Sequence, residues 1–278
     1  YMKNENIISY LNNVLQNLPK DWLDLTTHRL DIYKEELAKI EFLEGFETLY
    51  KANIFTKEAL GKLPTAYDYI RLGHPLSTVL EWAVAKTNNL PSENVISFSS
   101  NIIPLLAILR KNLVEKKKTL IVYKDKLPKN FNEKTLKQIY DYNFKLMKIE
   151  AINDIEYFDG SVVLLTNSDE IGILNNSKNI NFDIQIHQNL GSIVYALHSN
   201  EYISEIQHVR RRESIAMTPR DCYSALTQLI GKTQDSNSTI NPKNSYKTEL
   251  LETINTITKS SSKALLASSG LSIQYAVM

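Results

Sequence analysis

Cysteine, long apolar runs and an excess of either charge are all scarce in this chain. Its one cysteine, Cys222, cannot form an internal disulfide, which is typical of proteins in the reducing cytoplasm. The longest apolar stretch runs only from Ile102 to Leu109, far short of the ~20 residues that span a bilayer. The sequence therefore predicts a cytoplasmic protein without a disulfide framework or a membrane-spanning segment.

The charges nearly cancel, because 32 lysines and arginines face 31 acidic residues and leave a net charge of +1. No overall field would draw such a chain to nucleic acid or to an anionic membrane, so neither is expected as a partner, and any basic function has to be local. With 278 residues, of which 43% are hydrophobic and 23% charged, the composition is that of a globular protein of one large or two modest domains.

The spacing of apolar residues divides the chain into segments. Residues 3–57 carry helical spacing, with Ile7, Leu11 and Val14 on one face, so residues 1–63 are predicted to form an N-terminal helical arm. In residues 64–232, short apolar runs alternate with amphipathic stretches, which indicates an α/β domain with a largely parallel sheet and helices on both faces. The expected strands are 95–98, 119–123, 144–149, 161–166, 182–187 and 192–197, and the main expected helices are 76–87, 102–113, 132–142, 201–213 and 219–230.

The end of the chain has a different character. Residues 233–244 are rich in serine, asparagine and threonine, a composition typical of a linker. Residues 245–278 then begin a second domain, in which an expected helix, 246–258, precedes a short apolar strand, a Ser-Ser-Gly turn and the start of an apolar helix. A parallel strand requires neighbours on both sides, so we interpret the chain as the front of a longer protein.

The turn Ser268-Ser269-Gly270-Leu271 lies between the expected strand and helix of this second domain. Free backbone N–H groups and the positive end of a helix dipole converge at such a turn, which suits a phosphate group. Glycine also lets the backbone approach an anion closely. The alternative is an ordinary N-cap, because serine is favoured there in any helix.

The same order of elements occurs earlier in the chain. Ser99 and Ser100 follow the expected strand 95–98 and precede an apolar helix, and an amphipathic helix precedes each copy. We interpret the two copies as a diverged tandem repeat. Asn101 stands where the second copy has Gly270, so a side chain occupies the space that a phosphate would need. The first copy is therefore interpreted as a damaged anion site.

Residues 69–81, followed by the strand and Ser99-Ser100, resemble the Cys/Met-metabolism family of pyridoxal-phosphate enzymes, the group of the cystathionine synthases and lyases. Tyr69 and Arg71 match the family's Tyr-x-Arg, and His74 replaces the asparagine of its Gly-Asn-Pro turn. The strand 182–187, Phe-Asp-Ile-Gln-Ile-His, is similar to the family strand that leads into the loop with the Schiff-base lysine. The resemblance covers about residues 64–232 and restarts near 245.

The resemblance implies a fold, a cofactor and a site. The fold would be that of the fold type I PLP transferases, the cofactor pyridoxal 5'-phosphate, and the substrate a small amino acid in transsulfuration-type chemistry. In the family, the Tyr-x-Arg residues cross a dimer interface and bind the cofactor phosphate of the neighbouring subunit. The resemblance therefore implies an internal pseudo-dimer partner or a homo-oligomer. The implied cofactor-binding residues are Tyr69 and Arg71, contributed in trans, with Ser268, Ser269, Gly270 and Leu271 of the second domain.

The departures from the family concern catalysis. No lysine occurs between Lys178 and Lys232, so this half lacks the amine for covalent catalysis, and the Schiff-base lysine is expected beyond Met278. The segment before Phe182 is too short for the strand that carries the family's pyridinium-binding aspartate, and Asp183 is a poor substitute. This half is predicted to be catalytically inactive. The alternative is a non-catalytic scaffold kept for dimerisation; the substrate and the choice between elimination and replacement stay open.

Other polar residues have structural interpretations. The three arginines 210–212 point in different directions along a helix, which favours a solvated or interface face. His187 lacks a metal-ligand spacing. The lysines 116–118 are interpreted as a charged loop without a function, and Cys222 as an inert thiol.

Overall fold

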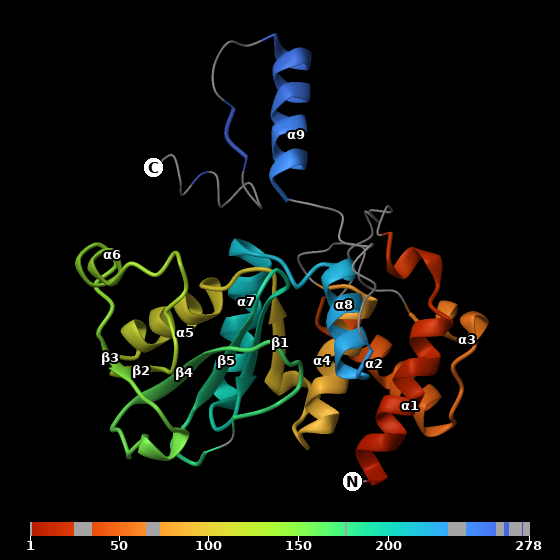
Figure 1. Cartoon of the computed structure of the whole chain (residues 1–278), viewed down its shortest axis with the longest axis horizontal. Helices are drawn as coiled ribbons and strands as arrows, with labels where there is room; N and C mark the ends of the chain where they lie inside the picture. Colours follow the sequence, from red (N-terminus) through yellow and green to blue (C-terminus); the bar gives the residue numbers. More distant parts are fainter. Residues whose placement is uncertain are drawn as a thin grey trace. The chain divides into compact units, whose positions relative to one another are not determined.

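The computed structural model describes residues 2–24, 35–64, 73–175, 177–232, 243–259, 264–266 and 274. The chain divides into two compact units, Tyr1–Lys232 and Thr233–Met278 (Figure 1). The first unit contains the sheet, and the second contains helix α9 (Lys243–Thr258). In the part of the chain that the structure describes, no helix is long and apolar enough to cross a membrane. The boundaries predicted at residues 63/64 and 244/245 stay predictions.

A six-stranded sheet forms the centre of the first unit, in the order β1-β6-β5-β4-β2-β3. Its strands are β1 (Val95–Phe98), β2 (Thr119–Tyr123), β3 (Phe144–Lys148), β4 (Ser161–Asn167), β5 (Phe182–His187) and β6 (Gly191–Ala196). β2 to β5 pair in parallel, whereas β6 is antiparallel to β5 and to β1. Three of the five pairings are thus parallel, as predicted for most of the sheet, and β6 is antiparallel because the three residues between β5 and β6 are too few for a parallel crossover.

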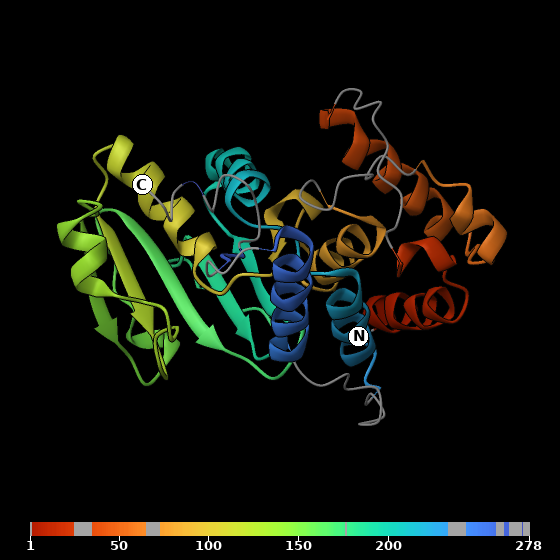
Figure 2. The ribbon, with the colours of Figure 1, turned by 90° about the horizontal axis from the view of Figure 1, so that it is seen from above.

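Helices cover both faces of the sheet, as the sequence predicts (Figures 1 and 2). On one face, α5 (Ile103–Val114) and α7 (Ile203–Glu213) enclose a core with Ile96 and Ile184 of the sheet. On the other, α4 (Pro75–Thr87) and α8 (Pro219–Leu229) pack on Val95 and Ile193. Successive strand residues point to opposite faces, so Val95 and Ile96 serve different cores. This confirms the mixed α/β fold class.

The N-terminal helices share a core with α4. They are α1 (Met2–Gln16), the 3-10 helix η1 (Lys20–Trp22), α2 (Glu35–Lys51) and α3 (Lys57–Gly61). The ring of Phe46 lies edge-on to that of Trp82 in α4, with centroids 5.1 Å apart, and Tyr50 contacts the same ring. The Trp82 indole N–H donates to Glu47 at 2.9 Å. The predicted arm therefore packs against the sheet-bearing segment.

One end of the sheet is covered differently. At β2 and β4, residues 149–160 cross the face opposite α5 and α7, and within them only the short 3-10 helix η3 (Ile152–Asp154) is regular. Ile149 and Ile155 of this segment are buried against Val122. The remaining short elements are α6 (Glu133–Gln138), η2 (Ser92–Asn94) and η4 (Asn200–Tyr202). α6 is shorter than the predicted helix 132–142, because the chain turns through Asp141 at a φ of 57°.

Candidate functional site

The carboxyl ends of β1, β2, β4 and β5 lie at one edge of the sheet, because β6 is antiparallel to both of its neighbours and leaves β1 parallel to β5. Ligands of open α/β sheets bind at this edge. Ser99 and Ser100 follow β1 there and contact the start of β6. The hydroxyl of Ser192 donates to the carbonyl oxygen of Ser100 at 2.6 Å.

Ser100 caps helix α5. Its Oγ accepts hydrogen bonds from the backbone N–H groups of Ile102 at 3.3 Å and Ile103 at 3.2 Å. Ser99 donates its own N–H to the carbonyl oxygen of Ile215 at 3.1 Å. A phosphate at this helix would need the same N–H groups. The chain's own hydroxyl thus occupies the anion position of the first repeat, which supports its interpretation as a damaged site.

A tight turn closes the same edge. His187 pairs with Gly191, so only Gln188, Asn189 and Leu190 separate β5 from β6. Gly191 has a φ of 130°, and a Cβ at this position would overlap the carbonyl oxygen of Phe98. The turn contains no lysine, and the end of β1 packs directly against it. The residues of this edge in the first unit therefore do not fit a covalently held pyridoxal phosphate.

The connection between β4 and β5 also departs from the family pattern. The two strands pair directly, from Val163 with Phe182 to Asn167 with Ile186. In residues 168–181, apart from residue 176, which the structure does not describe, no strand is formed. The strand that the resemblance would place between them, with its aspartate, is absent from the described sheet.

Asp183 is the centre of a buried polar group on β5. Its Oδ2 accepts from the backbone N–H of Asn175 at 3.1 Å and from the side-chain amide of Gln185 at 2.8 Å. Burial raises the pKa of Asp183 to about 6, although these hydrogen bonds oppose the shift. Among the described residues its Oδ1 has no hydrogen-bond partner. Sequence reasoning treated Asp183 as an ordinary strand residue and missed its complete burial.

His187 lies on the same face of β5 as Asp183. Its Nδ1 is 3.0 Å from the carbonyl oxygen of Ser168, and because a carbonyl only accepts, Nδ1 carries the proton. Its Nε2 is buried, without a hydrogen-bond partner in the described structure. Burial lowers the pKa of His187, so the imidazole is neutral. The residue is a core histidine.

A buried ion pair lies beside the outer edge of β1. Glu81 of α4 accepts at one carboxylate oxygen from the N–H of Ser97 at 2.9 Å and from Arg210 Nη1 at 2.6 Å. The same Nη1 donates to the carbonyl oxygen of Ser97 at 3.2 Å. Arg210 is only 4% exposed and contacts α4, so of the two predicted alternatives, a solvated or an interface face, the solvated one is wrong for this residue. A glutamate within the apolar stretch of residues 76–85 was the available signal for a buried partner.

His74 fixes the start of α4. Its Nδ1 accepts from the N–H of Ser77 at 3.1 Å, and its Nε2 donates to the carbonyl oxygen of Met217 at 2.7 Å. This pattern requires the neutral tautomer protonated at Nε2. Burial accordingly lowers the pKa of His74 to about 4. The histidine that replaces the family's asparagine thus performs an N-cap role and also links α4 to the start of α8.

The implied cofactor-binding residues all lie outside the described residues: Tyr69, Arg71, Ser268, Ser269, Gly270 and Leu271. Their proposed convergence stays a prediction. Of the elements near this site, the structure describes helix α4, which begins at Pro75, four residues after Arg71.

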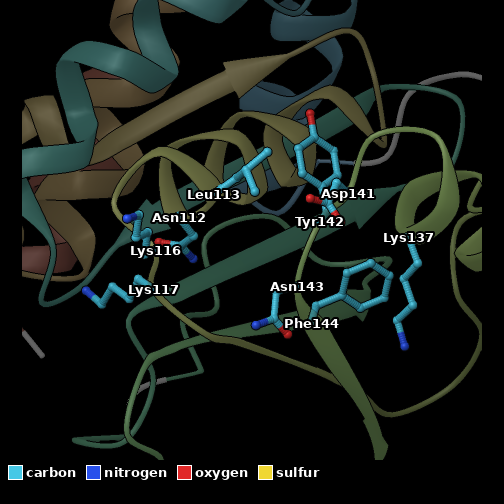
Figure 3. A pocket seen from close by; sticks show the side chains of 9 residues that line it. All are labelled: Asn112, Leu113, Lys116, Lys117, Lys137, Asp141, Tyr142, Asn143 and Phe144. Carbon is cyan, nitrogen blue, oxygen red and sulfur yellow. The ribbon is translucent and has the colours of Figure 1, made fainter.

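A cavity of about 590 Å³ lies away from this edge, beside the C-terminus of α5 and the start of β3 (Figure 3). It is lined by Asn112, Leu113, Lys116, Lys117, Lys137, Asp141, Tyr142, Asn143 and Phe144. The side chain of Asn112 is already engaged: its amide donates to Thr119 at 2.7 Å, and its oxygen accepts from Tyr202 and Ser161. In Figure 3 the lysine side chains diverge, so they do not converge on one ligand position.

Comparisons with known proteins give a weak structural similarity. No protein-family model matches the chain, and no curated protein does. Among solved structures, the crystal structure of metB from Corynebacterium glutamicum matches with a TM-score of 0.42 and 11% sequence identity. The match covers 60% of this chain and 54% of that chain, so it spans about half the length of the solved protein.

Proposed function

We propose that this chain is the N-terminal part of a pyridoxal-phosphate-dependent enzyme of sulfur amino-acid metabolism, and that this half is catalytically inactive. The observation that carries the proposal is the turn 188–190, which stands where the resemblance expects the loop with the Schiff-base lysine. Without that amine the first unit has no nucleophile for the cofactor. The sequence pattern around Tyr69 and Arg71 supplies the link to the family.

The two repeats have complementary losses. The first keeps Tyr69 and Arg71 but has Asn101 and a self-capped helix, and the second keeps Ser269 and Gly270 but has no Tyr-x-Arg before its strand. In the proposed arrangement, Tyr69 and Arg71 reach the cofactor phosphate held by the second repeat. The bound cofactor would supply an electron sink for the amino-acid substrate, and an arginine fork would hold its phosphate by charge-assisted hydrogen bonds.

The inactive half is tested directly on this chain. Pyridoxal phosphate is added, the mixture is reduced with borohydride, and the modified lysines are mapped by mass spectrometry. We expect low, distributed modification of surface lysines, because none lies in residues 179–231. Near-stoichiometric modification of one lysine would contradict the proposal.

The contact in trans is tested in the longer protein that the proposal implies. Arg71→Ala should weaken cofactor affinity by roughly ten- to a hundredfold, since a charge-assisted contact contributes ~1.5–3 kcal/mol. The matched control is Ser99→Ala, in the repeat whose anion position is self-capped, and it should leave affinity unchanged. Equal affinities for Arg71→Ala and the unaltered protein would remove the role in trans.

The second candidate is a non-catalytic scaffold or dimerisation module of the same fold. The self-capped α5 and the short β5–β6 turn support it, because a scaffold needs neither free N–H groups at the start of this helix nor a lysine in this turn. The two candidates differ in one sequence feature. A lysine on a loop after a strand, roughly 180–200 residues beyond Gly270, supports the enzyme, and its absence supports the scaffold.

A further inference from the structure

One part of the chain is strongly basic, although the net charge of the whole chain is only +1. Residues 116–148, which form β2, α6, β3 and their loops, contain ten lysines against three acidic residues, a net charge of +7. Nine of the ten lysine side chains are exposed, and Lys117 is half-buried. The lysines are 116, 117, 118, 124, 126, 129, 134, 137, 145 and 148. We call residues 116–148 the basic lobe.

An acidic segment follows directly along the chain. Residues 150–159 carry Glu150, Asp154, Glu156 and Asp159 without a lysine or arginine, and all four side chains are exposed. In the described structure, no ion pair joins these carboxylates to a lysine of the basic lobe. Both charged surfaces are therefore left to solvent.

Apart from Lys145, which shares a face of β3 with Met147, the two surfaces lie on opposite faces of the sheet beside one edge strand. Leu136 and Tyr142 of the basic lobe belong to the core under α5 and α7. Ile152 and Ile155 of the acidic segment belong to the core on the other face. β3 lies between them and is the terminal strand of the sheet. A surface with opposite charges on either side of a central line is complementary to its own copy turned by a twofold axis along that line.

Both surfaces also expose large apolar side chains. Tyr157 of the acidic segment is 83% exposed, and Ile139 of the basic lobe is 74% exposed. Tyr140 beside it is 53% exposed and stacks on Tyr142 at 5.7 Å between ring centroids. Apolar and aromatic contacts form the energetic centre of protein interfaces, and surrounding charges select the partner.

We propose that two copies of this chain associate along β3, so that the basic lobe of each copy contacts the acidic segment of the other. Each charge contact occurs twice in such a dimer. This interface involves none of the residues of the proposed cofactor site and does not depend on the proposed function. The electrostatic contribution to the free energy of dimerisation decreases as the salt concentration rises, because exposed charges are screened.

The experiment is a charge swap read by sedimentation equilibrium of the whole chain at low and high salt. The lobe variant is Lys129→Glu/Lys134→Glu/Lys148→Glu, and the segment variant is Glu150→Lys/Glu156→Lys/Asp159→Lys. Asp154 is left unchanged because it accepts from the N–H of Ala151 at 2.9 Å. The lobe variant lowers the net charge of the lobe from +7 to +1, and the segment variant reverses that of the segment from −4 to +2. Each variant alone should weaken dimerisation about tenfold or more, because the attraction between lobe and segment is lost. An equimolar mixture of the two should dimerise more tightly than either variant alone, since one of the two contacts then joins an unaltered lobe to an unaltered segment.

The matched control is Lys20→Glu/Lys57→Glu/Lys232→Glu, which makes the same charge change at exposed lysines outside the lobe and should leave dimerisation unaltered. Circular dichroism confirms that each variant is folded. The salt dependence of dimerisation of the unaltered chain tests the proposal without any variant. A chain that stays monomeric at low salt, or a mixture that dimerises no more tightly than the variants alone, overturns the proposal. A monomer that instead binds a labelled single-stranded oligonucleotide through its lobe assigns the lobe to nucleic acid and overturns it as well.

Discussion

Burial shifts the pKa values of two residues of the first unit in opposite directions. His74 has a pKa lowered to about 4 by burial, and Asp183 a pKa raised to about 6 by burial. Neutral His74 stabilises the fold fully above its unfolded pKa of about 6.5, and this contribution is lost as pH falls toward 4. Protonated Asp183 stabilises the fold fully below about 3.9, and this contribution is lost as pH rises through 6. Between pH 4 and 6 the two effects oppose each other.

The variant His74→Asn removes the effect of the histidine and leaves that of Asp183. Asparagine is also a good N-cap and can accept from Ser77, but it carries no titrating ring. Without the imidazole, only the protonation of Asp183 affects stability in this range. On acidification from pH 6.5 to 4.5, the free energy of unfolding of the variant should therefore rise by about 1–3 kcal/mol relative to that of the unaltered chain. Urea unfolding at several pH values measures this, and parallel pH profiles for variant and unaltered chain would contradict it.

Asp183→Asn makes the reverse change. An amide oxygen can still accept from Asn175 and Gln185, and the cost of an ionised buried carboxylate at neutral pH is removed. The variant should gain about 1–3 kcal/mol at pH 7 relative to pH 4, compared with the unaltered chain. The same urea series tests it; a variant that is less stable at pH 7 and unchanged at pH 4 would show that Asp183 is stabilising in its ionised form.

At the scale of elements, the ion pair of Glu81 and Arg210 seals the outer edge of β1. Both the N–H and the carbonyl oxygen of Ser97 point away from β6 and are satisfied by this pair. Unsatisfied edge strands invite pairing with other chains, so the pair protects the sheet as well as joining α4 to α7.

Arg210→Ala should destabilise the chain by about 3–5 kcal/mol, because it leaves Glu81 buried without its cation. The neighbouring Arg212→Ala, at an exposed position of α7, should cost less than about 0.5 kcal/mol. Glu81→Gln/Arg210→Met should recover much of the loss, since no charge is then buried. Urea unfolding compares the three, and equal costs for the two single arginine variants would contradict the sealing role.

Short apolar runs predicted the strands well where both faces are buried. The predicted strands 95–98, 119–123 and 182–187 agree with β1, β2 and β5. The antiparallel direction of β6 was not predicted, because a turn of three residues, rather than the apolar pattern, decides it. Arg210 was misplaced because three consecutive arginines look alike in sequence, and only the packing of α7 on β1 distinguishes the buried one. The self-capping by Ser100 depends on loop geometry that residue order does not encode.

At the scale of the whole molecule, the packing of residues 1–63 bears on the predicted boundary at 63/64. Nine apolar side chains of this segment are buried in the core that also contains Trp82 and Val79 of α4: Ile7, Tyr10, Leu11, Val14, Trp22, Phe42, Phe46, Leu60 and Leu63. Burial of each such side chain contributes roughly 1.5–3 kcal/mol, whereas domains are stable by only about 5–15 kcal/mol in total. The loss of this segment should therefore exceed the stability of what remains.

A chain of residues 64–232 should consequently fail to unfold cooperatively and should bind a hydrophobic dye, because its deletion exposes the α4 side of the core. A chain of residues 1–232 is the matched comparison, since it keeps the whole first unit and removes only the second. It should retain the unfolding midpoint that the full chain shows for the first unit. Thermal unfolding followed by circular dichroism compares the two. Cooperative unfolding of 64–232 near the midpoint of 1–232 would make residues 1–63 a dispensable arm, whereas its absence would make them part of the domain that carries the sheet.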